Sequence, residues 1–543
     1  MSFRLRIWGP ALGALALIGL LIVVGARRSL PQISGAVRVP GLHGPVTVMR
    51  DRWGVPHIYA GDEHDLFVAQ GYVTAQDRLW QMLLRRQAAR GLLSDWLGMR
   101  AASADSVLSR QDFYAQVTST PADPRADAYA LGVNACIANC SDPPELMLLK
   151  LQSKKKQIAP WTAVDSAALL RIMLWAQQKN SGTGLRQALS DQVGSAYVSD
   201  LLEQGLPTAP ALSLDPAARQ VLQSVGIPLQ AGGDTSPVII ETPPGLPTPW
   251  YVVTLHSEHT AVGGATWPGL PDVMVQQLDD IGREARPRRD LVTHLLALPP
   301  EGWLQFRVHG MLRQWDGDLS GKTSLSNASA AVYQVWVWHL ARDAFQDELG
   351  PELFTRYWLT GLAPDALTRL AERPDDPQDT LKGYAGWDDV TTPQREARDD
   401  IMRRAYVEAL DDLGRHYGDL HTIWEWDTAH AAVFRHPLGD TGPLSWLLNR
   451  EVKLGGGAPF DPAHPDDPLR PYAPARVSSL RIKQDANGGT MFALAGGQSG
   501  NPFSSHYADL LPVWARGASA PLQDAVRPQD WHDVEGVLVL TPG

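Results

Sequence analysis

The chain has 543 residues, of which 44% are hydrophobic and 20% are charged, and its formal net charge at pH 7 is −11. This composition excludes an intrinsically disordered chain, and the length suffices for a large core, divided over more than one lobe. The acidic balance argues against nucleic acid as a partner, because the sequence contains no basic stripe. The short run Lys154–Lys156 is interpreted as a solvated helix end.

An uncharged and mostly apolar run extends from Ile7 to Ala26, with arginines on both sides of it. A run of this length can span a bilayer, and it predicts an N-terminal transmembrane helix over residues 7–26. A cleaved signal peptide is the alternative, because Val24-Gly25-Ala26 resembles a weak cleavage site. We favour a retained anchor, since the run is longer than an ordinary signal-peptide core.

The segment that follows combines strand and helix patterns. An extended run, Val46–Met49, precedes the turn residues Trp53-Gly54, and Pro56 keeps the residue before it out of helical geometry. Asp62–His64 is typical of a helix start. A long amphipathic helix is predicted after it, because apolar residues recur largely at three- and four-residue steps: Leu66, Ala69, Val73, Leu79, Met82 and Leu83.

Several residues of this stretch match, in order, the pattern of a known family: Arg50-Asp51, Gly54–Ile58, Gly71-Tyr72, Ala75–Arg78 and Gln81-Met82. The stretch resembles the start of the penicillin acylase family, N-terminal-nucleophile hydrolases that cleave amides. The resemblance implies an α+β chain with a reduced penicillin-acylase-like fold (Ntn hydrolase, αββα-derived) and large helical lobes. Proteins that resemble this family are usually exported, so the chain after the anchor is expected outside the cytoplasm.

Cys136 and Cys140 are the two cysteines of the chain. In an oxidising compartment they predict a local disulfide, and buried free thiols are the alternative. A metal site would require two further ligands, which the neighbouring sequence does not offer.

The resemblance resumes near residue 310 and continues almost to the C-terminus. A core helix is predicted over residues 328–345 and a strand at the end of the chain. Histidines 430 and 436 lack a convincing set of partner ligands, so we expect structural hydrogen bonds rather than metal binding. The resemblance places Ser499 in a loop that supports the fold, not at the nucleophile. The matching residues are Trp315–Gly317, Trp424–Trp426, His430, His436–Leu438, Gly497–Pro502 and Ser505–Tyr507.

Between these regions the chain departs from the family at the nucleophile. Active members carry a Gly-Ser junction followed by Asn-Asn-Trp or similar, and backbone cleavage there frees the Ser amine to act as the base. Here Thr235 and Ser236 are the nearest hydroxyls, and Pro237 follows directly. We predict that neither hydroxyl is a nucleophile.

Two further departures concern the metal and the oxyanion site. Ser181–Arg186 contains no carboxylate where the family usually places a calcium-binding Glu. Met274–Asp280 stands where the family continues to a Gly-His-Asn segment, and the chain then passes to sequence that resembles a helix far downstream. The oxyanion Asn and the calcium-binding aspartates are missing with it. Asp279-Asp280 is interpreted as a solvated strand end, so we predict no catalytic, cofactor-binding or metal-binding residues.

These patterns predict a catalytically inactive, membrane-anchored member of the family. It would act as a scaffold or accessory subunit of a membrane complex, on the periplasmic face of a bacterial inner membrane. The alternative is a periplasmic amidohydrolase (acylase) that cleaves acyl amides with a relocated nucleophile. The predicted regions are the anchor at 1–30, a family N-terminal region at 31–230, a remnant of the nucleophile-bearing sheet at 231–282, and a family C-terminal region at 283–543.

Overall fold

The computed structural model describes most of the chain from residue 24 onward. No helix within the described part is both long and apolar enough to cross a membrane. Residues 7–23 of the predicted anchor lie outside it. The described residues are 24–118, 123–152, 158–178, 183–202, 218, 221–222, 225, 254–257, 289–317, 324–358, 362–372, 387–389, 391–418, 424–426, 431–439, 444–453, 467–469, 481–484, 490–494, 496–515, 518–522 and 532–543.

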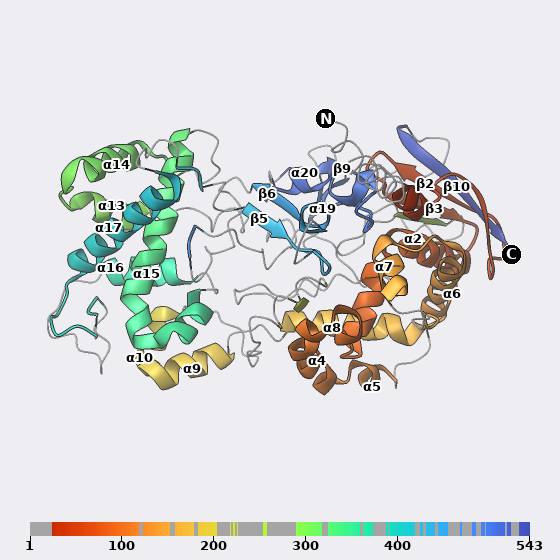
Figure 1. Ribbon diagram of the computed structural model, residues 1–543, viewed down its shortest axis with the longest axis horizontal. Coiled ribbons are helices and arrows are strands. Elements are labelled where there is room, and N and C mark those ends of the chain that lie inside the picture. Colours follow the sequence, from red (N-terminus) through yellow and green to blue (C-terminus); the bar gives the residue numbers. More distant parts are fainter. Residues whose placement is uncertain are drawn as a thin grey trace, which may run out of the picture.

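Both ends of the described chain meet in one five-stranded sheet, whose order is β1-β10-β2-β3-β4 (Figure 1). The C-terminal strand β10 runs parallel to β1 and antiparallel to β2, which confirms the predicted terminal strand. Leu538 and Leu540 of β10 are buried on one face of the sheet. The strands are β1 (Gly35–Val39), β2 (Val46–Asp51), β3 (Pro56–Ala60), β4 (Thr254–Ser257) and β10 (Val534–Pro542).

The predicted long helix is α2 (Glu63–Ala89), which packs against the sheet. Asp62 caps its N-terminus, because the Asp62 carboxylate accepts a hydrogen bond from the Asp65 amide at 2.8 Å. The six apolar positions that predicted the helix are all buried. The helical pattern is interrupted at Arg78 (φ −134°, ψ 17°), where the side chain donates to the Gln498 carbonyl of a C-terminal loop.

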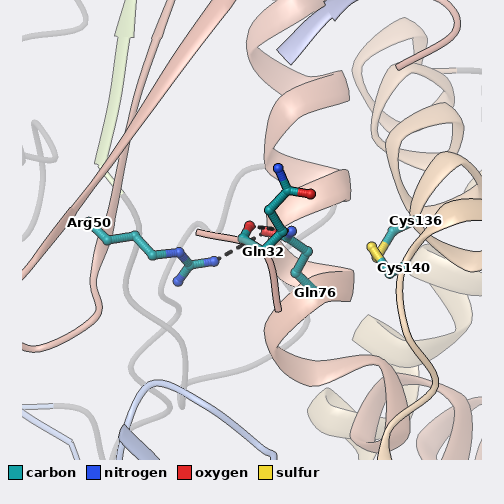
Figure 2. The surroundings of a disulfide bond; sticks show 5 residues. All are labelled: Gln32, Arg50, Gln76, Cys136 and Cys140. Atoms are coloured by element: carbon teal, nitrogen blue, oxygen red, sulfur yellow. Dashed lines mark hydrogen bonds between the residues drawn. A yellow bond between two sulfur atoms is a disulfide. The ribbon is translucent and has the colours of Figure 1, made fainter. Parts of the chain in front are cut away.

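Helix α6 (Pro124–Asn139) lies unusually close to α2; it contains Cys136, and Cys140 is its C-cap residue. Cys136 and Cys140 form a disulfide with a Cα–Cα distance of 4.8 Å, so the predicted disulfide is confirmed (Figure 2). Figure 2 also shows Gln76 of α2 between two partners: its amide accepts from Arg50 at 3.4 Å and donates to the Gln32 carbonyl at 3.0 Å.

The remaining elements of this lobe include helices that complete its hydrophobic core and smaller elements outside that core. Trp80, Tyr129 and Trp161 are its largest fully buried side chains. Helices of the lobe are α3 (Ser94–Leu97), α4 (Ala102–Leu108), α5 (Phe113–Val117), α7 (Pro144–Gln152), α8 (Ala163–Gln178), α19 (Leu444–Leu448) and α20 (Leu511–Ala515), with 3-10 turns at Met99–Ala101, Ser109–Gln111 and Ser505–Tyr507. Two small sheets contain β5 (Ala431–Phe434) with β6 (Arg450–Lys453), and β7 (Arg481–Gln484) with β8 (Thr490–Ala493) and β9 (Ala520–Pro521).

A second hydrophobic core belongs to a helical lobe that lies away from the five-stranded sheet (Figure 1). Its longest element, α15, contains the predicted core helix over 328–345 and bends at Gly350, where φ is +71° and Pro351 follows. Its helices are α9 (Thr183–Val193), α10 (Ser195–Leu201), α13 (Arg289–Ala297), α14 (Gly302–Gln314), α15 (Ser324–Trp358), α16 (Ala363–Glu372) and α17 (Arg398–Tyr417).

Candidate functional site

A buried ion pair joins the sheet to α2. Arg50 of β2 places its Nη1 2.8 Å from the Asp77 carboxylate of α2, and both side chains are buried. The same nitrogen donates to the Gly54 carbonyl at 3.0 Å. A guanidinium in this position satisfies an acid and a turn carbonyl together, so Arg50 and Asp77 hold strand, turn and helix in one arrangement.

The turn between β2 and β3 is closed by the Asp51 carboxylate. Its Oδ1 accepts from the amides of Trp53 at 2.9 Å and Val55 at 3.0 Å, and its Oδ2 lies 3.4 Å from His57 Nε2. Gly54 in this turn has φ +71°, and a Cβ added there would lie 2.6 Å from the His506 ring. The turn therefore requires glycine for its backbone and for the approach of His506.

The loop around Ser499 is fixed to α2 by backbone contacts. Arg78 donates to the carbonyls of Gly497 and Gln498, and the Gly500 amide donates to the Asp77 carbonyl at 2.8 Å. The Ser499 amide bonds to the His506 carbonyl at 2.9 Å, and its hydroxyl accepts from the Asn501 amide at 3.1 Å. Ser499 thus lies in a turn that supports the loop, the place that the resemblance implies.

His506 lies between two carboxylates, at 2.7 Å from Asp509 and at 2.7 Å from Glu535 of β10. Burial alone would lower the pKa of His506, but the hydrogen bonds to Asp509 and Glu535 outweigh burial and raise its pKa to about 9. At neutral pH the imidazole is therefore protonated on both nitrogens. It can donate hydrogen bonds but has no lone pair with which to act as a general base.

A cavity of about 170 Å³ opens beside this histidine. Its volume is below the range of about 300–1,000 Å³ typical of small-molecule sites. Because the imidazole beside the serine hydroxyls is a cation, they do not form an activated Ser–His pair with it. Polar lining residues include Arg50, Asp77, Ser499, Ser504, Ser505, His506 and Glu535.

The helical lobe contains a larger cavity of about 640 Å³, between α15 and α17. His339 lies in its lining with Nδ1 3.1 Å from Glu408 and Nε2 2.7 Å from Asp412. Arg342 contacts the same Glu408 carboxylate. The volume suits a small molecule. These charged side chains, however, already pair with one another, so we interpret them as a structural ion-pair network and not as a binding site.

A buried acid near the bend of α15 predicts a pH effect on stability. Glu348 is 9% exposed, and burial together with the neighbouring Asp347 raises its pKa to about 10. The folded chain thus keeps this proton up to about pH 10, whereas the unfolded chain releases it near 4.5. The stability that the protonated form contributes is therefore complete below pH 4.5 and is lost as the pH rises toward 10.

Glu348→Gln removes this titration. At pH 4.5 the free energy of unfolding of the variant should therefore be close to that of the parent. Above that pH the stability gain of the variant over the parent should grow by up to about 1.4 kcal/mol per pH unit. Urea unfolding at pH 5 and pH 8 measures the difference. Glu352→Gln, at an exposed position of the same helix, should change neither value. A Glu348→Gln effect that is equal at the two pH values would contradict the assignment.

The structure describes only some of the residues that the sequence analysis considered as nucleophiles or metal ligands. Thr235, Ser236, Asp279-Asp280 and His430 lie outside the described residues. Between Ser236 and Asp279 the structure describes only β4, which pairs parallel with β3 at the edge of the sheet. His436 makes the structural hydrogen bonds that we expected: its Nε2 lies 3.0 Å from buried Glu145, and its Nδ1 accepts from the Leu438 amide.

Sequence reasoning missed the role of His506. Asp509 is three residues away and could have suggested a partner, but Glu535 is 29 residues away on a strand whose neighbours the local pattern does not reveal. Asp77 was identified only as part of a family motif. The structure shows in addition that its carboxylate is the buried partner of Arg50.

Comparison with known proteins decides the family. The family model described as penicillin amidase matches residues 45–282 and 272–526, which together cover most of the chain. The chain belongs to the penicillin amidase family. The residues that carried the resemblance, among them Arg50, Asp77 and Arg78, are the ones that hold β2, α2 and the Ser499 loop together in this family member.

Individual relatives match parts of this penicillin amidase family chain. Penicillin acylase 2 proenzyme from Pseudomonas sp. (strain SE83) is 41% identical over 154 residues, which are 27% of this chain and 19% of the relative. Acyl-homoserine lactone acylase QuiP from Pseudomonas syringae pv. tomato is 33% identical over 248 residues, 41% of this chain and 27% of the relative. Penicillin G acylase from Escherichia coli is 37% identical over 111 residues, 19% of this chain and 13% of the relative.

The matched part of the chain therefore spans less than a third of the length of each of these relatives. Among solved structures, a thermostable penicillin G acylase from Alcaligenes faecalis aligns with 26% sequence identity over 32% of this chain and 97% of its own, at a TM-score of 0.25.

Proposed function

We propose that this chain is a hydrolase of acyl amides. The observation that supports the proposal is the match to the penicillin amidase family over residues 45–526, together with relatives that are named acylases. These comparisons favour the hydrolase over the inactive scaffold that we preferred from the sequence alone. The Arg50–Asp77 ion pair and the contact of Arg78 with the Ser499 loop also keep the residues of the family motif assembled around the sheet.

With hydrolysis favoured by the family, we replace our prediction from the sequence, that neither Thr235 nor Ser236 is a nucleophile, by the proposal that one of these two hydroxyls attacks the substrate. His506 is protonated, so the serines beside it are poor candidates. Thr235 and Ser236 lie nearest the position that the family uses for its nucleophile. Backbone cleavage before one of them would free an α-amine that takes the hydroxyl proton while the oxygen attacks the acyl carbon. The amine product then leaves with that proton, and water hydrolyses the acyl ester.

We propose that residues 7–26 hold this hydrolase at the periplasmic face of a bacterial inner membrane, because the run is uncharged and long enough to span a bilayer. A non-catalytic scaffold or accessory subunit of a membrane complex is the second candidate. The specific observation in its favour is the sequence between Leu229 and Trp250, which contains no Ser-Asn-Asn-Trp.

The two candidates differ in covalent state and in turnover. For the hydrolase we expect a chain cut before Thr235 or Ser236 and measurable hydrolysis of phenylacetyl or long-chain acyl amides by the purified full chain. Alanine at the correct hydroxyl should lower kcat/KM by about a hundredfold or more, because the reaction loses its nucleophile. Intact-mass measurement, N-terminal sequencing and an amine-release assay check these expectations.

Ser505→Ala provides a matched control, since it removes a cavity hydroxyl beside the protonated His506 and should leave turnover within about twofold of the parent. A single uncut polypeptide of 59.3 kDa with background turnover in the parent and all variants would overturn the hydrolase proposal. That outcome would leave the scaffold as the better explanation.

A further inference from the structure

Four potential metal ligands gather where the β1–β2 connection meets the N-terminus of α2. His43 belongs to the connection, and His64 and Asp65 belong to the first turn of α2. One ligand atom from each of these three side chains lies within 4.8 Å of the other two. The N-cap residue Asp62 adds a carboxylate oxygen 3.0 Å from His43 Nδ1. None of these side chains has a role in the hydrolysis proposed above.

The spacing between the groups is close to that of a tetrahedral site. Ligands about 2.0–2.2 Å from a zinc ion lie roughly 3.3–3.6 Å from one another. His43 Nδ1 lies 3.0 Å from Asp62 Oδ2 and 3.9 Å from Asp65 Oδ1, on either side of that value. The His43 and His64 rings stack with centroids 4.4 Å apart, so metal binding requires the His43 ring to turn, which also adjusts these two distances. His43 can do so, because its side chain is 65% exposed.

Backbone groups already orient two of the ligands. The buried Asp65 carboxylate accepts from the amides of His43 and Gly44, both at 2.8 Å. His64 Nε2 lies 2.9 Å from the Gly41 carbonyl and donates to it, which leaves the lone pair on Nδ1. Histidines that bind metals usually donate their second N–H to a carbonyl or carboxylate in this manner.

We propose that His43, His64, Asp62 and Asp65 bind a divalent transition-metal ion of the zinc class. Two imidazoles and two carboxylates suit Zn²⁺, whereas Ca²⁺ and Mg²⁺ prefer sites made of oxygen ligands alone. The positive end of the α2 dipole opposes a cation, but the two carboxylates place two full negative charges beside it. The ion would fasten the β1–β2 connection to the helix that carries the family motif.

Calorimetric titration of the full, chelator-treated chain with Zn²⁺ tests the site. We expect a binding event with a Kd of about 10 µM or tighter. His43→Ala and His64→Ala should each weaken it by about tenfold or more, because each removes a ligand. Substitution with Co²⁺ should produce the visible absorption of a tetrahedral complex in the parent and not in these variants. His416→Ala and His532→Ala, at exposed histidines elsewhere, should bind Zn²⁺ as the parent does.

Equal urea midpoints of all the variants without metal would show that folding is not the cause of a difference. The proposal is wrong if the parent shows no Zn²⁺ binding in this range, or if the double variant His43→Ala/His64→Ala binds as tightly as the parent. Either result leaves the hydrolase proposal unaffected, because that proposal uses none of these residues.

Discussion

Replacing Gly132 by alanine is expected to destabilise the chain by about 3–5 kcal/mol or to prevent its folding, a loss that exceeds the usual cost of overpacking of about 1–3 kcal/mol. Gly132 of α6 faces the backbone of α2, and an added Cβ would lie 1.8 Å from the Val68 carbonyl oxygen. The contact is reciprocal, since a Cβ on Gly71 of α2 would lie 2.0 Å from the Tyr129 carbonyl oxygen. Backbone atoms cannot rotate away, so the two helices would have to separate.

The measurement is the urea midpoint of the soluble protein, with soluble yield as a second readout. Gly310→Ala is the matched control, because Gly310 lies inside α14 with no atom within 4 Å of an added Cβ. Alanine there should be neutral or stabilise the chain by up to about 1 kcal/mol through helix propensity. A Gly132→Ala variant with the midpoint of the parent would contradict a close backbone contact between α2 and α6.

The α2–α6 contact illustrates what the sequence alone could predict. The periodicity of Leu66, Ala69 and Val73 identified the helix and its buried face, because a 3.6-residue period is a local property. Gly71 was recognised only as part of a family motif. The requirement for glycine at this position comes from the Tyr129 backbone of another helix. The distance between two helices produces no periodic pattern in the sequence.

The five-stranded sheet also has features that the sequence predicts and features that it does not. Alternation and turn residues were sufficient to locate β2 and the terminal strand β10, whereas the parallel pairing of β10 with β1 joins segments about 500 residues apart and could not be predicted from either. Glu535 lies at the other end of β10, which pairs with β2, and there it meets His506 beside the β2–β3 turn. A histidine that the sequence left as one motif residue among many is thereby held as a cation, a property that follows only from the assembled fold.

Arg50→Met is expected to destabilise the chain by about 3–5 kcal/mol, the usual cost of breaking a buried ion pair by removing one partner. Methionine fills a similar volume but removes the cation that faces the Asp77 carboxylate at 2.8 Å and the donor to the Gly54 carbonyl. Urea unfolding at pH 7 measures the loss. Arg52→Met is the control, because Arg52 is an exposed neighbour and its replacement should stay within about 0.5 kcal/mol of the parent.

A double variant separates the ion pair from the packing of its members. In Arg50→Met/Asp77→Leu neither charge remains to be solvated in the interior, so part of the stability lost in Arg50→Met should return. The coupling free energy in the double-mutant cycle should therefore exceed about 1 kcal/mol in favour of the pair. Additive losses would mean that Arg50 stabilises the chain mainly through the Gly54 carbonyl and the β2–β3 turn. Asp77 would then contribute little to stability through its charge. The contact between Arg50 and the β2–β3 turn, rather than the ion pair, would be the reason for an arginine at this position.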